Sequence, residues 1–158
     1  MRPSKYMYYI EFAKTAMLRS TCLKRNYGAV IIKDDRVIST GYNGAPRGIK
    51  NCTDIGTCPR LHVPSNTDYT TCRSVHAEAN AIIHADYNDM IGATLFLYGR
   101  DAQTGKPIDI VEPCPMCRRM IINAQIAKVV CLAPQSIDGY VVYDTKAWID
   151  EDNGAVCG

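Results

Sequence analysis

The fold is decided by residues 28–42, which read Gly28-Ala29-Val30-Ile31-Ile32-Lys33-Asp34-Asp35-Arg36-Val37-Ile38-Ser39-Thr40-Gly41-Tyr42. Two apolar, β-branched runs flank a polar turn, a pattern that predicts a β-hairpin. A helical stripe of apolar residues precedes the hairpin over residues 6–20, and helical and strand patterns alternate after it. This alternation favours an α/β/α sandwich around a mixed sheet. We expect the hairpin strands to be antiparallel and the later strands, joined through helices, to be parallel.

The downstream patterns predict a long loop over residues 43–71 and a second loop over 101–112. A loop as long as the first is uncommon in a compact domain, which indicates a functional role or a tether. The other predicted elements are helices over 75–87 and 115–124, strands over 93–98, 128–132 and 140–143, and a short segment near Trp148. There is no internal repeat, so we interpret residues 1–158 as one domain.

Composition excludes several classes of protein. Hydrophobic residues make up 47% of the chain, yet no run of 18 apolar residues exists, so a membrane span is not expected. The net charge is only +2, and no Lys/Arg cluster exceeds two residues, which argues against a polynucleotide partner. The N-terminus lacks the pattern of a secretion signal, so we expect a cytoplasmic protein whose eight cysteines stay reduced. Clustered reduced cysteines favour metal binding.

Two short motifs carry the chemistry. His76-Ala77-Glu78 opens one predicted helix, and Pro113-Cys114-Pro115-Met116-Cys117 opens the next. Taken alone, a His and a Glu near a helix start more often have no catalytic role, and the Cys-x-x-Cys motif could be a redox pair or half of a structural zinc site. Together and in this order they match the known signature of the zinc-dependent deaminases.

The physical logic supports that match. A helix start favours thiolate over thiol, so Cys114 and Cys117 are suited to bind a cation, and His76 supplies a third ligand. Three protein ligands leave one tetrahedral position for a water whose pKa zinc lowers to about 7. Glu78 is placed near that water without being a ligand, which predicts a general acid–base role.

Four segments resemble the deoxycytidylate (dCMP) deaminases of the cytidine deaminase-like superfamily: residues 22–31, 39–48, 72–82 and 113–117. The resemblance implies an α/β/α fold with a five-stranded sheet and zinc-dependent hydrolysis of dCMP to dUMP and ammonia, which supplies dUMP for thymidylate synthesis. It also implies a homohexamer in many members, activation by dCTP and inhibition by dTTP. Two departures from the family lie in the lead-in Ile110-Val111-Glu112-Pro113 and in residues 133–158, which lack an expected tyrosine-containing segment.

The same resemblance implies several binding residues. Asn43 is expected to contact the nucleoside, Arg25 and Asn26 the phosphate, and Ala77 the substrate. The loop Gly44–Gly48 is expected near the nucleotide or effector site, with Gly44 and Arg47 as its candidates.

A second cysteine group surrounds the long loop: Cys22, Cys52, Cys58 and Cys72. These thiols could be buried apolar side chains, but we favour a closed structural zinc site of four cysteines, with His62 as a substitute ligand. Some members of the family carry a second zinc there. Cys131 lies in an apolar strand and is expected in the core, and His84 is expected to be structural.

Two alternatives remain open. The same zinc chemistry could act on cytidine, cytosine, guanine or adenosine in tRNA. A non-catalytic, zinc-stabilised binding module could keep the same fold, although such a module would not need Glu78.

Overall fold

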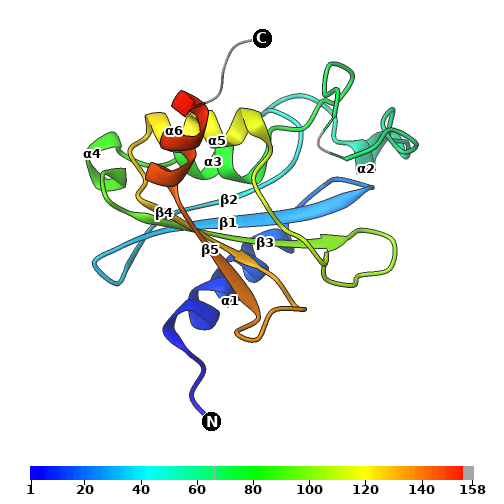
Figure 1. The fold of residues 1–158 in the computed structure, drawn as a ribbon. Helices are drawn as coiled ribbons and strands as arrows, with labels where there is room; N and C mark the ends of the chain where they lie inside the picture. The colour runs from blue at the N-terminus through cyan, green and yellow to red at the C-terminus, as the bar shows by residue number, and fades with distance from the viewer. Residues whose placement is uncertain (66, 155–158) are drawn as a thin grey trace.

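The computed structural model describes residues 1–65 and 67–154 of the chain. Its centre is a five-stranded sheet in the order β2-β1-β3-β4-β5. The strands are β1 (Arg25–Lys33), β2 (Arg36–Tyr42), β3 (Thr94–Asp101), β4 (Lys128–Leu132) and β5 (Tyr140–Asp144). Helix α1 (Lys5–Met17) covers one face, whereas α3 (Ala77–Ile83), α5 (Pro115–Asn123) and α6 (Thr145–Gly154) lie on the other (Figure 1). The predicted α/β/α sandwich with a mixed five-stranded sheet is confirmed.

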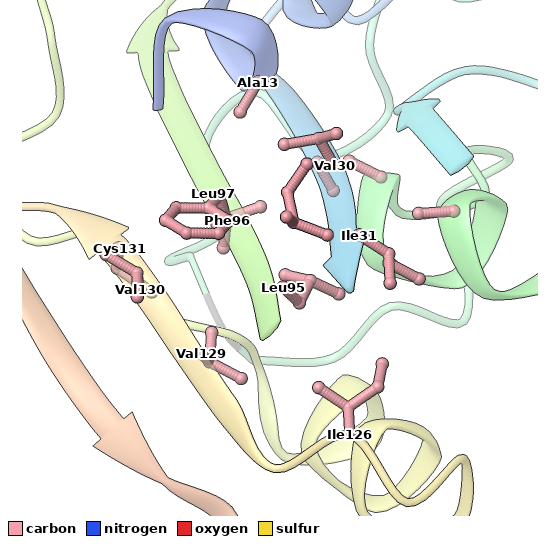
Figure 2. Close-up of a cluster of buried hydrophobic side chains, with 14 of the residues drawn as sticks. Ala13, Val30, Ile31, Leu95, Phe96, Leu97, Ile126, Val129, Val130 and Cys131 are labelled. Carbon is pink, nitrogen blue, oxygen red and sulfur yellow. The ribbon is translucent and has the colours of Figure 1, made fainter. Parts of the chain in front are cut away.

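The core lies on both faces of the three central strands. Val30 of β1, Leu95 and Leu97 of β3, and Val129 of β4 are fully buried, and Figure 2 shows their side chains between the sheet and the helices. Strands covered on both faces read as continuous apolar runs, which explains the unbroken Ala29–Ile32 stretch.

Strand direction differs in part from the expectation. β3 and β4 are parallel, as predicted, but β3 runs antiparallel to its other neighbour β1, and β5 antiparallel to β4. The connection through α3 carries the chain from β2 past β1 to β3, so the two strands that it joins are parallel but not adjacent. The link between Leu132 and Tyr140 is a short turn that holds no helix, so β5 must return antiparallel.

The helices also differ in their bounds. The helix predicted over residues 75–87 is α3 followed by a separate short helix, α4 (Tyr87–Met90), which Asp86 caps by accepting a hydrogen bond from the Asn88 N–H. The segment near Trp148 is the complete helix α6, and the long loop contains the short helix α2 (Cys52–Ile55). Among residues 1–65 and 67–154, no helix combines the length and apolar character needed to cross a bilayer.

Two glycines let helices approach the sheet from opposite sides. A Cβ atom on Gly28 of β1 would lie 2.0 Å from the carbonyl oxygen of Ala13 in α1. A Cβ atom on Gly41 of β2 would lie 2.3 Å from the carbonyl oxygen of Ala77 in α3. Neither distance is sterically accessible, so both helix positions depend on glycine.

Candidate metal centre and substrate cavity

Three side chains from two helix starts meet at the carboxyl-end edge of β2 and β3. His76 is the N-cap residue of α3, and Cys114 is the N-cap residue of α5, one turn before Cys117. The His76 Nδ1 atom lies 3.5 Å from the Cys114 Sγ atom and 3.4 Å from the Cys117 Sγ atom. The three ligand atoms all lie within 4.8 Å of one another.

These separations fit a zinc ion. With Zn–S about 2.3 Å and Zn–N about 2.0–2.1 Å, tetrahedral geometry places nitrogen and sulfur ligands about 3.6 Å apart. The donor set of one imidazole and two thiols is one that zinc prefers, and three protein ligands leave a fourth position for a reacting molecule. The geometry therefore meets the requirements of a catalytic zinc site.

The helix starts favour the charge state that zinc needs. The Cys114 sulfur accepts a hydrogen bond from the Cys117 backbone N–H, with 3.5 Å between nitrogen and sulfur. The pKa of Cys114 is lowered from 9.0 to about 4, because the Cys117 thiol donates to its sulfur and His76 adds a further bond. Pro115 begins α5, where its missing N–H costs nothing. The bond from the Cys117 thiol to the Cys114 sulfur also raises the pKa of the Cys117 thiol, so in the absence of metal the pair shares one proton and the negative charge lies on Cys114.

Glu78 lies beside the ligands but is not one of them. Its side chain is buried, with 4% of its surface exposed, and it lines the same cavity as His76 and Cys114. Burial raises the pKa of its carboxyl group above the ordinary value. A carboxyl group in a dry site holds and releases protons more readily near neutral pH, which is the property a general acid–base needs.

Helix α3 is fixed to β2 by polar bonds as well as by close packing. The Ser39 hydroxyl donates to the Ala81 carbonyl oxygen at 2.7 Å, and the Asn80 amide donates to the Tyr42 carbonyl oxygen at 2.7 Å. Nδ1 of His84 lies 2.9 Å from the Thr40 carbonyl oxygen. His84 thus serves to attach the helix, as the sequence predicts.

His76, Cys114 and Glu78 line one side of a cavity. Ala77 lines it, together with the predicted residues Arg25 and Asn43. The residues that sequence reasoning missed are Lys24, Tyr27, Arg60, Ser65, Tyr69, Ser74 and Glu112. Cys22 and Cys72, predicted as zinc ligands, also line this cavity.

The long loop is closed at its base next to the metal ligands. Gly44 and Val75 form an isolated antiparallel bridge, with backbone N–H to O distances of 3.2 Å and 2.7 Å. Residues 45–74 therefore leave and return at one place, directly before His76. Lys24, which lies just before β1, fixes the middle of this long loop by donating hydrogen bonds to the carbonyl oxygens of Arg60 and Val63.

Asn43 and Asn26 belong to one buried hydrogen-bond network. The Asn43 side-chain oxygen accepts from the Tyr27 N–H at 2.9 Å and from the Ser20 hydroxyl, and its amide donates to the Arg25 carbonyl oxygen at 2.9 Å. Asn43 also lines the cavity, where the predicted nucleoside contact would occur.

Asn26 is placed differently from the prediction. Its amide donates to the Cys22 carbonyl oxygen at 2.8 Å and to the Ser20 hydroxyl at 3.2 Å, and its oxygen accepts from Arg100 Nε at 3.0 Å. It does not line the cavity, because successive residues of a strand point to opposite faces and Arg25 and Tyr27 take the cavity side. A phosphate contact by Asn26 is not supported.

The second cysteine group comes together only loosely. The pKa of Cys52 is raised by burial and by the sulfurs of Cys22, Cys58 and Cys72, so all four thiols lie in one region. Among the residues described, however, no three of these sulfurs lie within 4.8 Å of one another. His62 is exposed and does not join them.

The loop Gly44–Gly48 lines a second, separate cavity. Its wall also contains Arg19, Thr21, Asn51 and His84, and Arg47 is exposed there. Cys131 is fully buried in the core, as predicted. Trp148 lies outside the substrate cavity and packs against Tyr143 and the Arg118 guanidinium.

Comparison with known proteins identifies the family. A family model described as the cytidine and deoxycytidylate deaminase zinc-binding region matches residues 3–133. The chain belongs to this family.

Individual relatives agree with the family model. The deoxycytidylate deaminase of Mycobacterium phage D29 is 41% identical over 136 residues, which cover 82% of this chain and 94% of that protein. The deoxycytidylate deaminase of Saccharomyces cerevisiae is 38% identical over 130 residues, covering 82% of this chain but 38% of its own length. This deaminase-family chain thus spans nearly all of the phage relative and about two fifths of the yeast relative.

A solved structure shares the fold. The dCMP deaminase of the cyanophage S-TIM5, crystallised in complex with dCMP and dUMP, superimposes with a TM-score of 0.58 at 25% identity. The match covers 83% of this chain and 82% of that one. The sheet and its helices are therefore those of a cytidine deaminase-like fold.

Proposed function

We propose that this protein hydrolyses the exocyclic amine of dCMP, giving dUMP and ammonia, and so supplies dUMP for thymidylate synthesis. The observation that carries the proposal is the meeting of His76, Cys114 and Cys117 at zinc-ligand distances beside the buried Glu78. The two relatives described above bear the name deoxycytidylate deaminase, and the S-TIM5 enzyme was crystallised in complex with dCMP and dUMP. Deamination of dCMP accounts for both the geometry and the relatives.

The chain's own residues divide the work. His76, Cys114 and Cys117 would hold the zinc ion, which supplies Lewis-acid activation of the attacking water. Glu78 accepts one proton of that water and delivers it to N3 of the pyrimidine ring, and it then transfers the proton of the newly added hydroxyl group to the departing amine. A bond forms between carbon 4 and the water oxygen, the carbon–nitrogen bond breaks, and ammonia leaves. Asn43 and Ala77, on the cavity wall, orient the nucleoside, and Arg25 contributes to phosphate binding.

The direct test is ammonia release by purified protein from a panel of dCMP, CMP, dCTP, deoxycytidine, cytosine and guanine. We expect dCMP to have the highest kcat/KM. If another member of the panel has the highest kcat/KM, the same zinc chemistry acts on that compound and the assignment of dCMP is wrong. No release from any of them would favour a zinc-stabilised binding module.

We further propose a structural zinc held by Cys22, Cys52, Cys58 and Cys72. The four thiols lie in one region on loops and on the first residue of α2, segments that a bound ion can draw together. A closed four-cysteine site would stabilise a loop that has little regular structure. If one thiol does not participate, His62 is the substitute ligand, because it lies on the same loop.

We also propose nucleotide effectors, dCTP and dTTP, for the cavity lined by Gly44 and Arg47. The bridge from Gly44 to Val75 connects this cavity with the residue before His76, which gives an effector a short physical path to the metal centre. Velocity measured against dCMP with and without dCTP tests this. Light scattering during size-exclusion chromatography tests the homo-oligomer, expected as a hexamer.

A further inference from the structure

Arg60 is a buried cation that forms no direct ion pair with the described residues, although its charge lowers the pKa of Asp68 on the same loop. Only 5% of its surface is exposed. Removing a guanidinium from water costs several kcal/mol unless another group compensates. A buried, unpaired charge on a cavity wall is therefore a candidate for ligand recognition.

The Arg60 side chain is locked in one orientation. Its Nε donates to the Asp68 carbonyl oxygen at 2.7 Å, and its Nη2 donates to the Pro64 carbonyl oxygen at 3.0 Å. Its guanidinium carbon lies 4.3 Å from the centre of the Tyr69 ring, and that ring meets the His76 ring edge-on at 4.7 Å. The orientation is thus set by the loop itself before any ligand arrives.

One side of the guanidinium remains available. The Nη1 group makes no hydrogen bond to the residues that the structure describes. Among the described residues, the side-chain nitrogens that are fully buried and lack a hydrogen-bond partner are Nε of Arg73 and Nε of Arg118. Nη1 of Arg60 is not one of them, so it retains some exposed surface. Since Arg60 lines the substrate cavity, these free N–H groups can reach a ligand there.

Two more cations stand on the same wall. Lys24 and Arg25 line the cavity, and the pKa of Lys24 is lowered by burial and then by the charges of Arg60 and Arg25. The acidic groups of the cavity do not neutralise them. Glu112 pairs with Arg118 at 3.4 Å, and Glu78 is the buried carboxyl group beside the metal ligands. The cavity therefore carries a positive charge that an anionic ligand would balance.

We propose that Arg60 recognises the 5′-phosphate of the substrate and makes a nucleotide, in place of a nucleoside, the preferred substrate. The proposal rests on the proposed deamination of dCMP. A guanidinium held by its own loop loses little conformational entropy when it binds, and charge-assisted bonds from arginine to phosphate are strong. Lys24 and Arg25 add charge, while Arg60 adds fixed geometry.

The test compares dCMP with deoxycytidine in Arg60→Gln and in the wild-type protein. Removing one partner of a buried charged contact weakens binding strongly, so we expect kcat/KM for dCMP to fall by about 10²-fold. The value for deoxycytidine should change by less than about threefold, because the phosphate contact is absent there. Arg60→Lys should recover part of the dCMP activity, since it keeps the charge and loses the planar fork.

The matched control is Arg36→Gln, which removes an exposed arginine at the turn of the hairpin, at the opposite end of β1 and β2 from the cavity residues Tyr27 and Asn43. It should leave both substrates unaffected. Equal losses for dCMP and deoxycytidine in Arg60→Gln would show a purely structural role and overturn the inference. Absence of dCMP deamination by the wild-type protein would instead overturn the proposed function.

A second measurement uses the wild-type protein and does not depend on folding of the variant. Phenylglyoxal modifies accessible arginines, and peptide mass spectrometry locates each modified residue. Inorganic phosphate should protect Arg60 and leave Arg36 unprotected. Equal modification of Arg60 with and without phosphate would contradict the proposal.

Discussion

Gly41 of β2 lies directly under the carbonyl group of Ala77, the residue between His76 and Glu78. A Cβ atom at position 41 would come within 2.3 Å of that oxygen and 2.4 Å of the Ala81 nitrogen. Because these are backbone atoms, no side-chain rotation can relieve the contact. The position of both catalytic groups relative to the sheet therefore depends on the absence of one methyl group.

Gly41→Ala should push the start of α3 away from β2. We expect a loss of about 1–3 kcal/mol in the free energy of unfolding, the usual cost of overpacking. A 1 Å displacement of catalytic groups can cost about 10²-fold in rate, so the fall in kcat should exceed what the stability loss explains. Denaturant titration and steady-state assays at 25 °C measure the two quantities. Gly154→Ala is the control, because its new methyl group meets no atom within 4 Å. Equal behaviour of the two variants would refute the role of this close contact.

Glu78→Gln removes the proton acceptor while preserving volume. We expect the rate of ammonia release from dCMP to fall by at least about 10²–10⁴-fold, the typical contribution of general acid–base catalysis. Zinc content should remain that of the wild-type protein, since Glu78 is not among the three ligands at the centre. Metal analysis by mass spectrometry and an ammonia assay check both parts. Glu151→Gln, on the exposed surface of α6, serves as the control. Unchanged turnover in Glu78→Gln would defeat the catalytic assignment.

Asn26→Ala tests whether this residue binds phosphate or maintains structure. Its three hydrogen bonds join Cys22, Ser20 and Arg100, so its loss should destabilise the protein by about 2–4 kcal/mol. The ratio of kcat/KM for dCMP and deoxycytidine should not change. Arg25→Gln, on the cavity side of the same strand, should lower that ratio with a smaller effect on stability. A selective loss of dCMP activity in Asn26→Ala would restore the original prediction of a phosphate contact.

Metal content separates the two proposed zinc sites. We expect about two zinc ions per chain, with Cys117→Ser losing one together with activity. Cys58→Ser should lose the other, with a lowered melting temperature and residual dCMP deamination. Inductively coupled plasma mass spectrometry of dialysed protein gives the counts. A single zinc in the wild-type protein would contradict the structural site.

The candidate metal ligands and the candidate proton acceptor could be identified from the sequence because their spacing is local. His76 and Glu78 lie on one helix start, and Cys114 and Cys117 lie one turn apart on another, so short motifs identify both groups. The hairpin was also predictable, since the alternation of apolar runs and a polar turn lies within residues 28–42. Each of these features depends on neighbours within a few positions.

The cavity wall could not be predicted in the same way. Arg60 and Tyr69 lie on a loop whose position depends on long-range contacts, such as the bonds from Lys24 to the carbonyl oxygens of Arg60 and Val63. Sequence periodicity gives no information on such contacts. The position of Asn26 could not be predicted without the register of β1, because the register decides the face of the sheet to which each side chain points. The direction of β3 relative to its neighbour β1 could not be predicted either, because the sequence does not show that β1 lies between β2 and β3, the two strands that α3 connects.

The Gly44–Val75 bridge has a consequence for how related sequences can diverge. Because the backbone closes there, changes in the length of the segment beyond it need not move the backbone at Val75, which precedes His76. Evolution can therefore rewrite the part of the enzyme that admits a substrate while conserving the part that transforms it. A protein engineer could exploit the same separation by exchanging this segment between related enzymes as a replaceable module.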